Sequence, residues 1–340
     1  MPDFRHLIKM TTRSGILQFS QHQNPDPSSG YTLDDNARAL LVFLKTKTSY
    51  PEIWNYINYL YTAQQPDGTW FNFLLNDQFS SRFDSEDSIG RAILACSMGA
   101  LSTRPEIRNV CSLMIEKSLP RARHFTSPRG VAYVLIALCK GHVPHLNNQQ
   151  RRELVNRLSS YLMRLYRHNH FPGWYWYEDC LTYCNGIIPH ALLCVYALNN
   201  DKQALKVGRE SLDFLNSILF RDGYLNIIGN QGWYYRGDSI PLFDQQPVDA
   251  ASIALACLEG YKVVGKSEYH DLAILAHAWY RGTNIHGVSL YDELTGGCCD
   301  ALTAEGVNLN QGAEAVVSML LTDLAMEESE TILIPAEQLS

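Results

Sequence analysis

The sequence is poor in positive charge and has no long apolar run. It holds 28 Lys and Arg against 35 Asp and Glu, a net charge of −7, and no basic run is longer than a pair. Nucleic-acid binding depends on clustered cations, so DNA and RNA are poor partners. No stretch of about 18 uninterrupted apolar residues occurs, and the first residues lack the layout of a signal peptide. We therefore expect a soluble, cytoplasmic chain that does not enter a membrane.

Motifs for metals, cofactors and common nucleophiles are also missing. The nine cysteines lack the close spacings of a disulfide scaffold or a zinc site, and the eleven histidines show no HExxH pattern. No Gly-rich phosphate loop follows a strand, and no GxSxG motif surrounds a serine. We therefore expect a reducing compartment, no metal site and no cofactor. Calcium held by carboxylates stays open, because such a site needs no EF-hand loop.

One kind of segment recurs six times along the chain: a short polar or glycine-containing stretch followed by an apolar helical run. The six segments are residues 31–44, 85–100, 127–139, 185–198, 246–261 and 310–321. Pro, Gly, Ser, Asp or Asn stands at the start of each, as at helix N-termini. Apolar residues cover nearly the whole circumference of these helices, which predicts that they are buried on all sides.

Amphipathic segments alternate with the apolar ones, at residues 51–63, 104–117, 149–167, 202–219 and 268–281. This alternation predicts an all-α fold, an (α/α)6 toroid of six helical hairpins with inner helices shielded by outer ones. We expect one domain over residues 1–325, a flexible C-terminal tail over 326–340, and short strands in the rim loops, at 223–235 and 287–291. All inner helices then begin on one rim, where the preceding loops converge on a funnel.

Acidic residues gather where the predicted inner helices begin. Each alone is explained as a helix cap, because a carboxylate accepts backbone N–H bonds and favours the helix dipole. Several carboxylates against apolar walls have pKa values that are driven apart, which is what glycoside cleavage requires. We predict Asp35 and Asp249 as a catalytic pair, with Glu178 as the alternative general acid.

Aromatic and basic residues in the same regions leave two readings open. Exposed rings stack on sugars, but the run at 171–179 also suits core filling, with every other ring buried. Arg38, Arg91 and Arg129 lie in or at the start of apolar helices, where a buried guanidinium needs an anion. For them, pairing with neighbouring acids (Asp34, Glu86 and Asp87) is favoured over substrate contact. For His190, a core histidine bonded to a backbone carbonyl is favoured over a catalytic base.

Together these patterns resemble the six-hairpin (α/α)6 glycosidase superfamily. Four blocks, residues 15–41, 174–193, 243–256 and 291–320, further resemble an uncharacterised bacterial domain often encoded with, or fused to, glycosyltransferases. The chain departs from that pattern at Cys184, where an acidic residue is usual, and at Ala315 and Val316, where small hydroxyl residues are usual. The resemblance implies that the four blocks line the pocket with Asp34, Asp35, Asn36, Arg38, Glu178, Asp179, Gln246, Asp249, Asn308, Asn310, Gln311 and Glu314.

The resulting hypothesis is a glycoside hydrolase that acts on an oligosaccharide or polysaccharide, with a glycosyltransferase as a possible partner. The alternatives are a non-catalytic glycan-binding module, a sugar epimerase and a terpene-cyclase-like enzyme. An epimerase would need a pair of pocket histidines, and His190 is the only good candidate on an inner helix. The terpene-cyclase-like alternative rests on a single QxxxGxW motif of Gln64, Gly68 and Trp70. The predicted substrate-binding residues are Asp34, Asn36, Arg38, Glu86, Asp87, Arg129, Trp174, Trp176, Tyr177, Asp179, Trp233, Gln246, Asp292, Asn310, Gln311 and Glu314.

Overall fold

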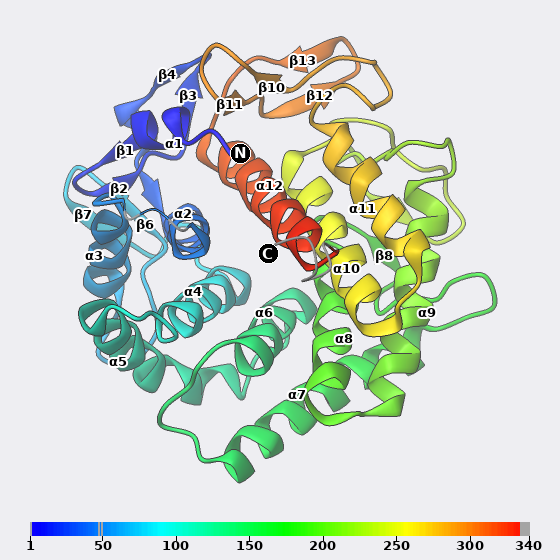
Figure 1. The fold of residues 1–340 in the computed structure, drawn as a ribbon, viewed down its shortest axis with the longest axis horizontal. Helices are drawn as coiled ribbons and strands as arrows, with labels where there is room; N and C mark the ends of the chain where they lie inside the picture. Colours follow the sequence, from blue (N-terminus) through cyan, green and yellow to red (C-terminus); the bar gives the residue numbers. More distant parts are fainter. Residues whose placement is uncertain (1, 47, 49, 334–340) are drawn as a thin grey trace, which may run out of the picture.

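Six largely apolar helices surround the centre of the molecule in the part of the chain that the structure describes (Figure 1). In this computed structural model, which describes residues 2–46, 48 and 50–333, each inner helix contacts the next, and the last contacts the first, so the ring is closed. The inner helices are α2 (Leu33–Lys45), α4 (Glu86–Gly99), α6 (Pro128–Lys140), α8 (Ile187–Asn199), α10 (Pro247–Val264) and α12 (Ala313–Leu333).

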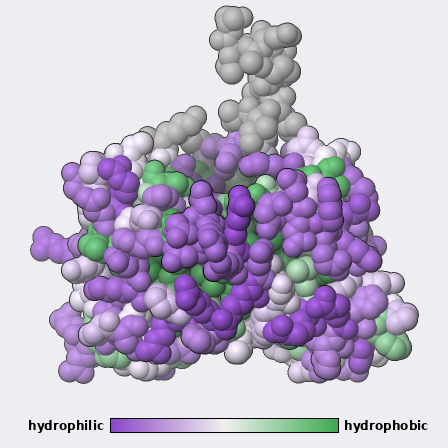
Figure 2. Space-filling model, turned by 90° about the horizontal axis from the view of Figure 1, so that it is seen from below, coloured by the Kyte–Doolittle hydropathy of each residue, from purple (hydrophilic) through white to green (hydrophobic). Residues whose placement is uncertain are grey.

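An outer layer of helices packs around this ring (Figure 1). It consists of α1 (Arg5–Met10), α3 (Ile53–Ala63), α5 (Pro105–Ala122), α7 (Asn148–Asn169), α9 (Lys202–Leu219) and α11 (Ser267–Trp279). The predicted (α/α)6 toroid is confirmed. The sequence missed α1, which contacts α12, because six residues carry too little periodicity to be recognised. Seen from its edge, the toroid is mostly hydrophilic, with apolar residues in scattered groups (Figure 2).

Side-chain caps fix where the inner helices begin. The hydroxyl groups of Thr32, Ser85 and Ser127 accept backbone N–H bonds from the first turns of α2, α4 and α6. Helices α4 and α6 then approach closely at two glycines. A Cβ atom on Gly90 would lie 2.9 Å from the carbonyl oxygen of Gly130, so only glycine permits this packing.

Strands are short and lie in the loops between helices. The loop strands are β1 (Thr11–Thr12), β2 (Gly15–Ile16), β3 (Ser20–Gln21), β4 (Asn24–Pro25), β5 (Tyr31–Thr32), β6 (Phe73–Leu75), β7 (Gln78–Ser80), β8 (Cys180–Leu181), β9 (Tyr234–Tyr235), β10 (Tyr291–Asp292), β11 (Gly297–Cys298), β12 (Ala301–Thr303) and β13 (Gly306–Asn308). All pair as antiparallel hairpins or two-stranded ribbons except β5, β6 and β7, which form one three-stranded sheet. Of the two predicted strand regions, only β9 and the first residue of β10 form strand.

The C-terminal helix is longer than expected. Residues 326–333 are helical rather than a flexible tail, because Met326 is buried and Glu328 forms an ion pair with Lys45 at 2.9 Å. The rest of the predicted tail, residues 334–340, lies outside the described residues. Among the described helices, none is long and apolar enough to cross a membrane.

Candidate functional site

Two neighbouring cavities open where the inner helices α2, α4, α10 and α12 begin. The larger, called the main cavity here, has a volume of about 360 Å³, and the adjoining cavity has about 270 Å³. Asp34, Asn230, Gln246 and Glu314 line both of them. The main cavity is also lined by Gln18, Phe19, Thr32, Asp35, Asn72, Phe83, Asp244, Pro247, Asp300, Ala301, Asn308, Gly312 and Ala315, and the adjoining cavity by Arg38, Ser85, Asp87, Arg91, Tyr183, Trp233 and Val248.

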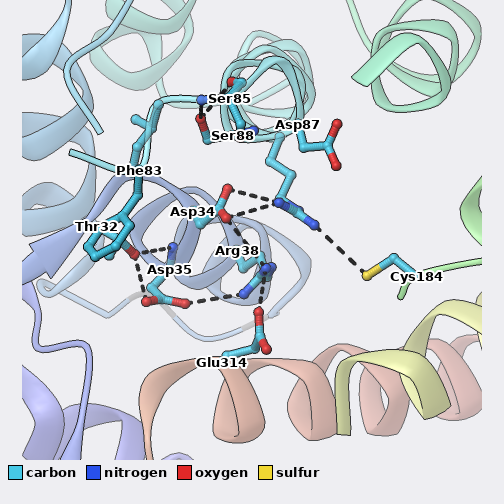
Figure 3. Close-up of polar contacts among 12 residues, drawn as sticks. Thr32, Asp34, Asp35, Arg38, Phe83, Ser85, Asp87, Ser88, Cys184 and Glu314 are labelled. Carbon is cyan, nitrogen blue, oxygen red and sulfur yellow. Dashed lines mark hydrogen bonds and ion pairs between the residues drawn. The ribbon is translucent and has the colours of Figure 1, made fainter. Parts of the chain in front are cut away.

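Arg38 joins carboxylates that are far apart in the sequence (Figure 3). Its guanidinium donates to Asp35 at 3.2 Å and to Glu314 of α12 at 2.8 Å, and it lies 3.9 Å from Asp34. Arg38 is buried, whereas the Glu314 side chain is 44% exposed. One cation therefore holds the start of α2 against the start of α12 and leaves the Glu314 carboxylate open to the cavity.

Asp35 is a buried carboxyl group in the wall of the main cavity. The hydroxyl of its helix cap, Thr32, donates to one carboxylate oxygen at 2.6 Å, and Arg38 donates to the other. Burial raises the pKa of Asp35 to about 7, the Arg38 charge opposes this, and Glu314 reinforces it. Asp35 therefore keeps its proton close to neutral pH, which is the property of a general acid.

Arg91 occupies the adjoining cavity with an incomplete set of partners. It donates to both oxygens of Asp34 at 3.0 Å and lies over the ring of Tyr133. A third contact goes to the Cys184 sulfur at 3.9 Å, where the resembled domain has an acid. Within the described part of the chain, no group accepts from its buried Nε atom. The predicted pairing of Arg91 with Asp34 is confirmed.

Asp87 lies beside Arg91 and is held by two hydroxyl groups. The hydroxyls of Ser127 and Tyr183 each donate to one oxygen of its carboxylate. These bonds link the start of α4 to the start of α6 and to the loop before α8. Asp87 therefore combines a bridging role in the structure with a place in the cavity wall.

Asp249 lies in a narrow recess instead of either larger cavity. The recess, of about 10 Å³, has room for about one water molecule and is also lined by Thr182 and Ser252. The backbone N–H of Cys184 donates to the Asp249 carboxylate at 2.5 Å. Burial nevertheless raises the pKa of Asp249 to about 7. The predicted partner of Asp35 is thus a buried acid with a raised pKa that lines neither the main nor the adjoining cavity.

Arg129 and Glu178 anchor the loop before α8. Arg129 donates to Glu178 at 3.0 Å, to the backbone carbonyl of Tyr183 at 2.6 Å, and to the side chains of Thr182 and Asn185. Neither Arg129 nor Glu178 lines the two larger cavities. Asp179, next in the chain, is exposed. This arrangement accounts for the buried Arg129 charge without a substrate.

The aromatic run before α8 is mostly core. Trp174 is 3% exposed and its indole N–H donates to the Glu178 carbonyl, while Trp176 and Tyr177 are fully buried. The prediction that these three rings bind substrate is wrong, because they fill the space between α7, α9 and the loop, as in the contact of Trp174 with Phe214. Trp233 does line the adjoining cavity.

Several other predicted site residues brace the rim. The buried Asn36 accepts from Ile16 N–H and donates to the Thr32 carbonyl, and the buried Gln311 bonds to Thr295 and Asp292, so the prediction of substrate contact is wrong for both. Glu86 and Asn310 accept backbone N–H bonds from the neighbouring rim segments at Thr126, Ser127 and His22.

The sequence missed part of the cavity wall. Phe19 and Phe83 are each 53% exposed and line the main cavity, as expected of rings that a sugar can stack on. Asp300 also lines it, accepts from Gly312 N–H at 2.6 Å, and has its pKa raised to about 6 by burial. Asp300 lies within the fourth resembled block. The pattern of acids at helix starts did not identify it, because α12 begins only at Ala313.

The side chains best placed to ligate a metal ion lie away from these cavities. The cavity carboxylates Asp34, Asp35 and Glu314 are engaged by arginines. No histidine lines the two cavities among the described residues. A cluster of His190, Cys194 and Glu259 lies deeper in the ring and is considered below.

No protein-family model matches the chain, and no curated protein sequence matches it. Solved structures do share its fold. The cellobiose 2-epimerase of Spirochaeta thermophila is 16% identical with a TM-score of 0.68, covering 94% of this chain and 91% of that one. A D-mannose isomerase is 13% identical with a TM-score of 0.70, covering 97% and 96%. A GH76 α-mannanase of Bacteroides thetaiotaomicron is 11% identical with a TM-score of 0.62, covering 89% and 88%. At these identities the likeness establishes the (α/α)6 fold.

Proposed function

We propose that this chain is a carbohydrate-active enzyme, and specifically a glycoside hydrolase that binds its glycan in the main cavity. The observation that carries the proposal is the buried carboxyl group of Asp35, whose pKa is raised to about 7, in the wall of a polar cavity with further carboxylates. Exposed rings at the same cavity suit the apolar faces of sugars. Proteins of the same fold include an α-mannanase and sugar epimerases.

Asp35 serves as the general acid in this proposal. Its proton passes to the glycosidic oxygen as the bond from that oxygen to the anomeric carbon breaks. The carboxylate that forms is stabilised by the Thr32 hydroxyl and the Arg38 guanidinium, which already contact it. Burial therefore raises the pKa of Asp35, and the two hydrogen-bond donors stabilise its negative charge once the proton has left.

Asp300 is the second carboxylate. It lines the same cavity, its pKa of about 6 leaves it ionised at neutral pH, and Gly312 N–H fixes one of its oxygens. An ionised carboxylate can take a proton from the water that attacks the anomeric carbon, or attack that carbon itself. The anomer of the first product distinguishes these two routes. Asp249, which the sequence favoured, is the alternative second carboxylate, because its pKa is also raised.

The test is product release from a panel of α- and β-linked gluco- and manno-oligosaccharides. Wild type is compared with Asp35→Asn, Asp300→Asn and Asp249→Asn, and the exposed Asp271→Asn on α11 serves as the matched control. We expect wild type and the control to cleave at least one glycan and Asp35→Asn to lose at least about 100-fold in turnover. Full activity in Asp35→Asn removes that residue from the mechanism. Comparison of Asp300→Asn with Asp249→Asn assigns the second carboxylate.

A sugar epimerase or isomerase is the second candidate, because solved structures with this fold include both. The histidine-free lining of the two described cavities favours the hydrolase. The same incubations separate the two, since an epimerase changes the sugar while the chain length of the glycan stays constant. A glycan that raises the melting temperature without reacting indicates the non-catalytic binding module, for which a glycosyltransferase is the proposed partner.

The terpene-cyclase alternative loses its supporting motif. Trp70 is buried and its indole N–H donates to the Leu60 carbonyl at 2.9 Å, while Gln64 donates to the Met114 carbonyl. Gly68 has a positive φ and packs against the backbone of Lys117. The QxxxGxW motif therefore fastens the end of α3 to α5, and its role is accounted for without a hydrocarbon substrate.

A further inference from the structure

Three metal-ligating side chains meet inside the ring, away from the funnel. His190 and Cys194 lie one turn apart on α8, and Glu259 lies on the neighbouring inner helix α10. They are 8%, 1% and 4% exposed, and none of them lines the main or the adjoining cavity. Spacing of i and i+4 on one helix places two side chains on the same face, which is a common arrangement for paired metal ligands.

The donor atoms are already close together. One ring nitrogen of His190, the sulfur of Cys194 and a carboxylate oxygen of Glu259 all lie within 4.8 Å of one another. The Cys194 thiol donates to Glu259 Oε1 at 3.5 Å, and the Lys140 ammonium donates to Oε2 of the same carboxylate. One oxygen of Glu259 thus accepts from a cation of the protein, and the other accepts from the thiol.

The environment of His190 is a second observation, independent of the short distances between the donor atoms, that points to a bound ligand. The sequence favoured a backbone carbonyl as its partner, but neither of its ring nitrogens has a hydrogen-bond partner in the described part of the chain. Burying an imidazole without any partner is costly. A bound cation reduces that cost, because it takes the lone pair of one nitrogen.

We propose that His190, Cys194 and Glu259 form a binding site for a thiophilic divalent cation, with Zn²⁺ as the best fit. A sulfur, a nitrogen and an oxygen ligand suit zinc, which binds such sets in tetrahedral geometry and takes water in an open fourth position. On binding, the Cys194 thiol releases its proton to solvent and the thiolate coordinates the metal. Lys140 keeps its bond to the outer oxygen of Glu259 and orients the carboxylate.

Such a site would tie α8 to α10, the helix that also carries Asp249 and Ser252 of the recess. This role is one of stability and does not depend on the proposed hydrolase function. This site is not predictable from the sequence, because Cys194 and Glu259 are 65 residues apart.

The experiment measures metal binding on the full chain after chelator treatment under reducing conditions. Co²⁺ is added as a spectroscopic probe, and Zn²⁺ affinity is measured by competition with a chromophoric chelator. We expect one equivalent per chain, a thiolate-to-cobalt absorption band and a raised melting temperature. Cys194→Ser should lose the band, and both Cys194→Ser and His190→Gln should bind Zn²⁺ at least about 100-fold more weakly, since even outer-shell changes cost 10–100-fold.

Two matched controls keep the result specific. Cys257→Ser changes a fully buried thiol on α10, and Cys298→Ser removes one of the two adjacent cysteines. Both should retain the cobalt band, and circular dichroism of the metal-free variants checks that each one is folded. The proposal is overturned if wild type binds no stoichiometric metal, which would mean that water alone satisfies His190. It is also overturned if Cys194→Ser keeps wild-type affinity or if Cys298→Ser abolishes binding. Glycan cleavage plays no part in this readout, so failure here leaves the hydrolase proposal standing.

Discussion

Replacing Asp35 by asparagine should make the stability of this protein less dependent on pH. Burial raises the pKa of Asp35 from 3.8 to about 7 in the folded chain. Between these values the unfolded chain has lost the proton and the folded chain still holds it. Unfolding then releases protons, so the free energy of unfolding falls as pH rises through this window and is flat above it. Asparagine does not titrate, so the free energy of unfolding of the variant lacks this fall with rising pH.

The size of the effect follows from the difference between the two pKa values. Each pKa unit corresponds to about 1.4 kcal/mol. A difference of about 3 therefore gives about 4 kcal/mol as the largest relative gain of Asp35→Asn between about pH 4 and about pH 8. The amide also loses one of the two bonds that Thr32 and Arg38 donate to the carboxylate. That loss costs about 1 kcal/mol at every pH. The slope of the difference against pH, not its absolute value, is the quantity to measure.

Urea unfolding of wild type and Asp35→Asn at several pH values across this window gives the slope. Asp292→Asn is the matched control. Burial acts to raise the pKa of Asp292, but bonds from Gln311 and Leu294 outweigh it and the pKa is lowered. The stability that Asp292 contributes is lost only as pH falls through that lowered value, so its difference curve should be flat across the window. Parallel curves for wild type and Asp35→Asn would refute the reasoning.

Three further outcomes are expected. Turnover of a cleaved glycan should fall as pH rises above about 7, where Asp35 loses its proton, and a pH–rate profile without that fall contradicts its role as the acid. Phe83→Ala should raise KM about tenfold through loss of about 1.4 kcal/mol of stacking, with little change in melting temperature, whereas Trp176→Phe should lower stability and leave KM unchanged. Arg129→Met should lower the free energy of unfolding by about 3 kcal/mol, because it frees the loop before α8 and leaves Glu178 unpaired, and urea unfolding curves that match wild type count against this.

The sequence determined the ring itself. Apolar circumference, polar helix starts and the alternation with amphipathic segments are local properties, and they predicted the six inner helices and five of the outer ones. Local chemistry also marked the helix starts, since Thr32, Ser85 and Ser127 cap the helices that follow them. Asp35 was found in the same way, because its place in the first turn of α2 follows from that cap.

The tertiary structure decided which of the marked residues face the cavity. In the run before α8, Trp174 and Trp176 are buried and Tyr175 is exposed, as the alternation predicts. Tyr177 is buried as well, because its ring packs against Tyr166 of α7 and its hydroxyl contacts Ser211 of α9. Asp300 reaches the main cavity only because the loop of β12 folds back over the start of α12, where Gly312 N–H meets it.

The sequence also did not predict the contacts between residues that are far apart along the chain. The Arg38 contact with Glu314 spans 276 residues, and the cluster of His190, Cys194 and Glu259 forms only when α8 packs beside α10. Burial, and with it the raised pKa of Asp35, Asp249 and Asp300, arises from such contacts between distant segments. The sequence alone therefore determined which residues begin each helix, and closure of the ring decided which of them share a site, because proximity and desolvation are properties of the folded chain.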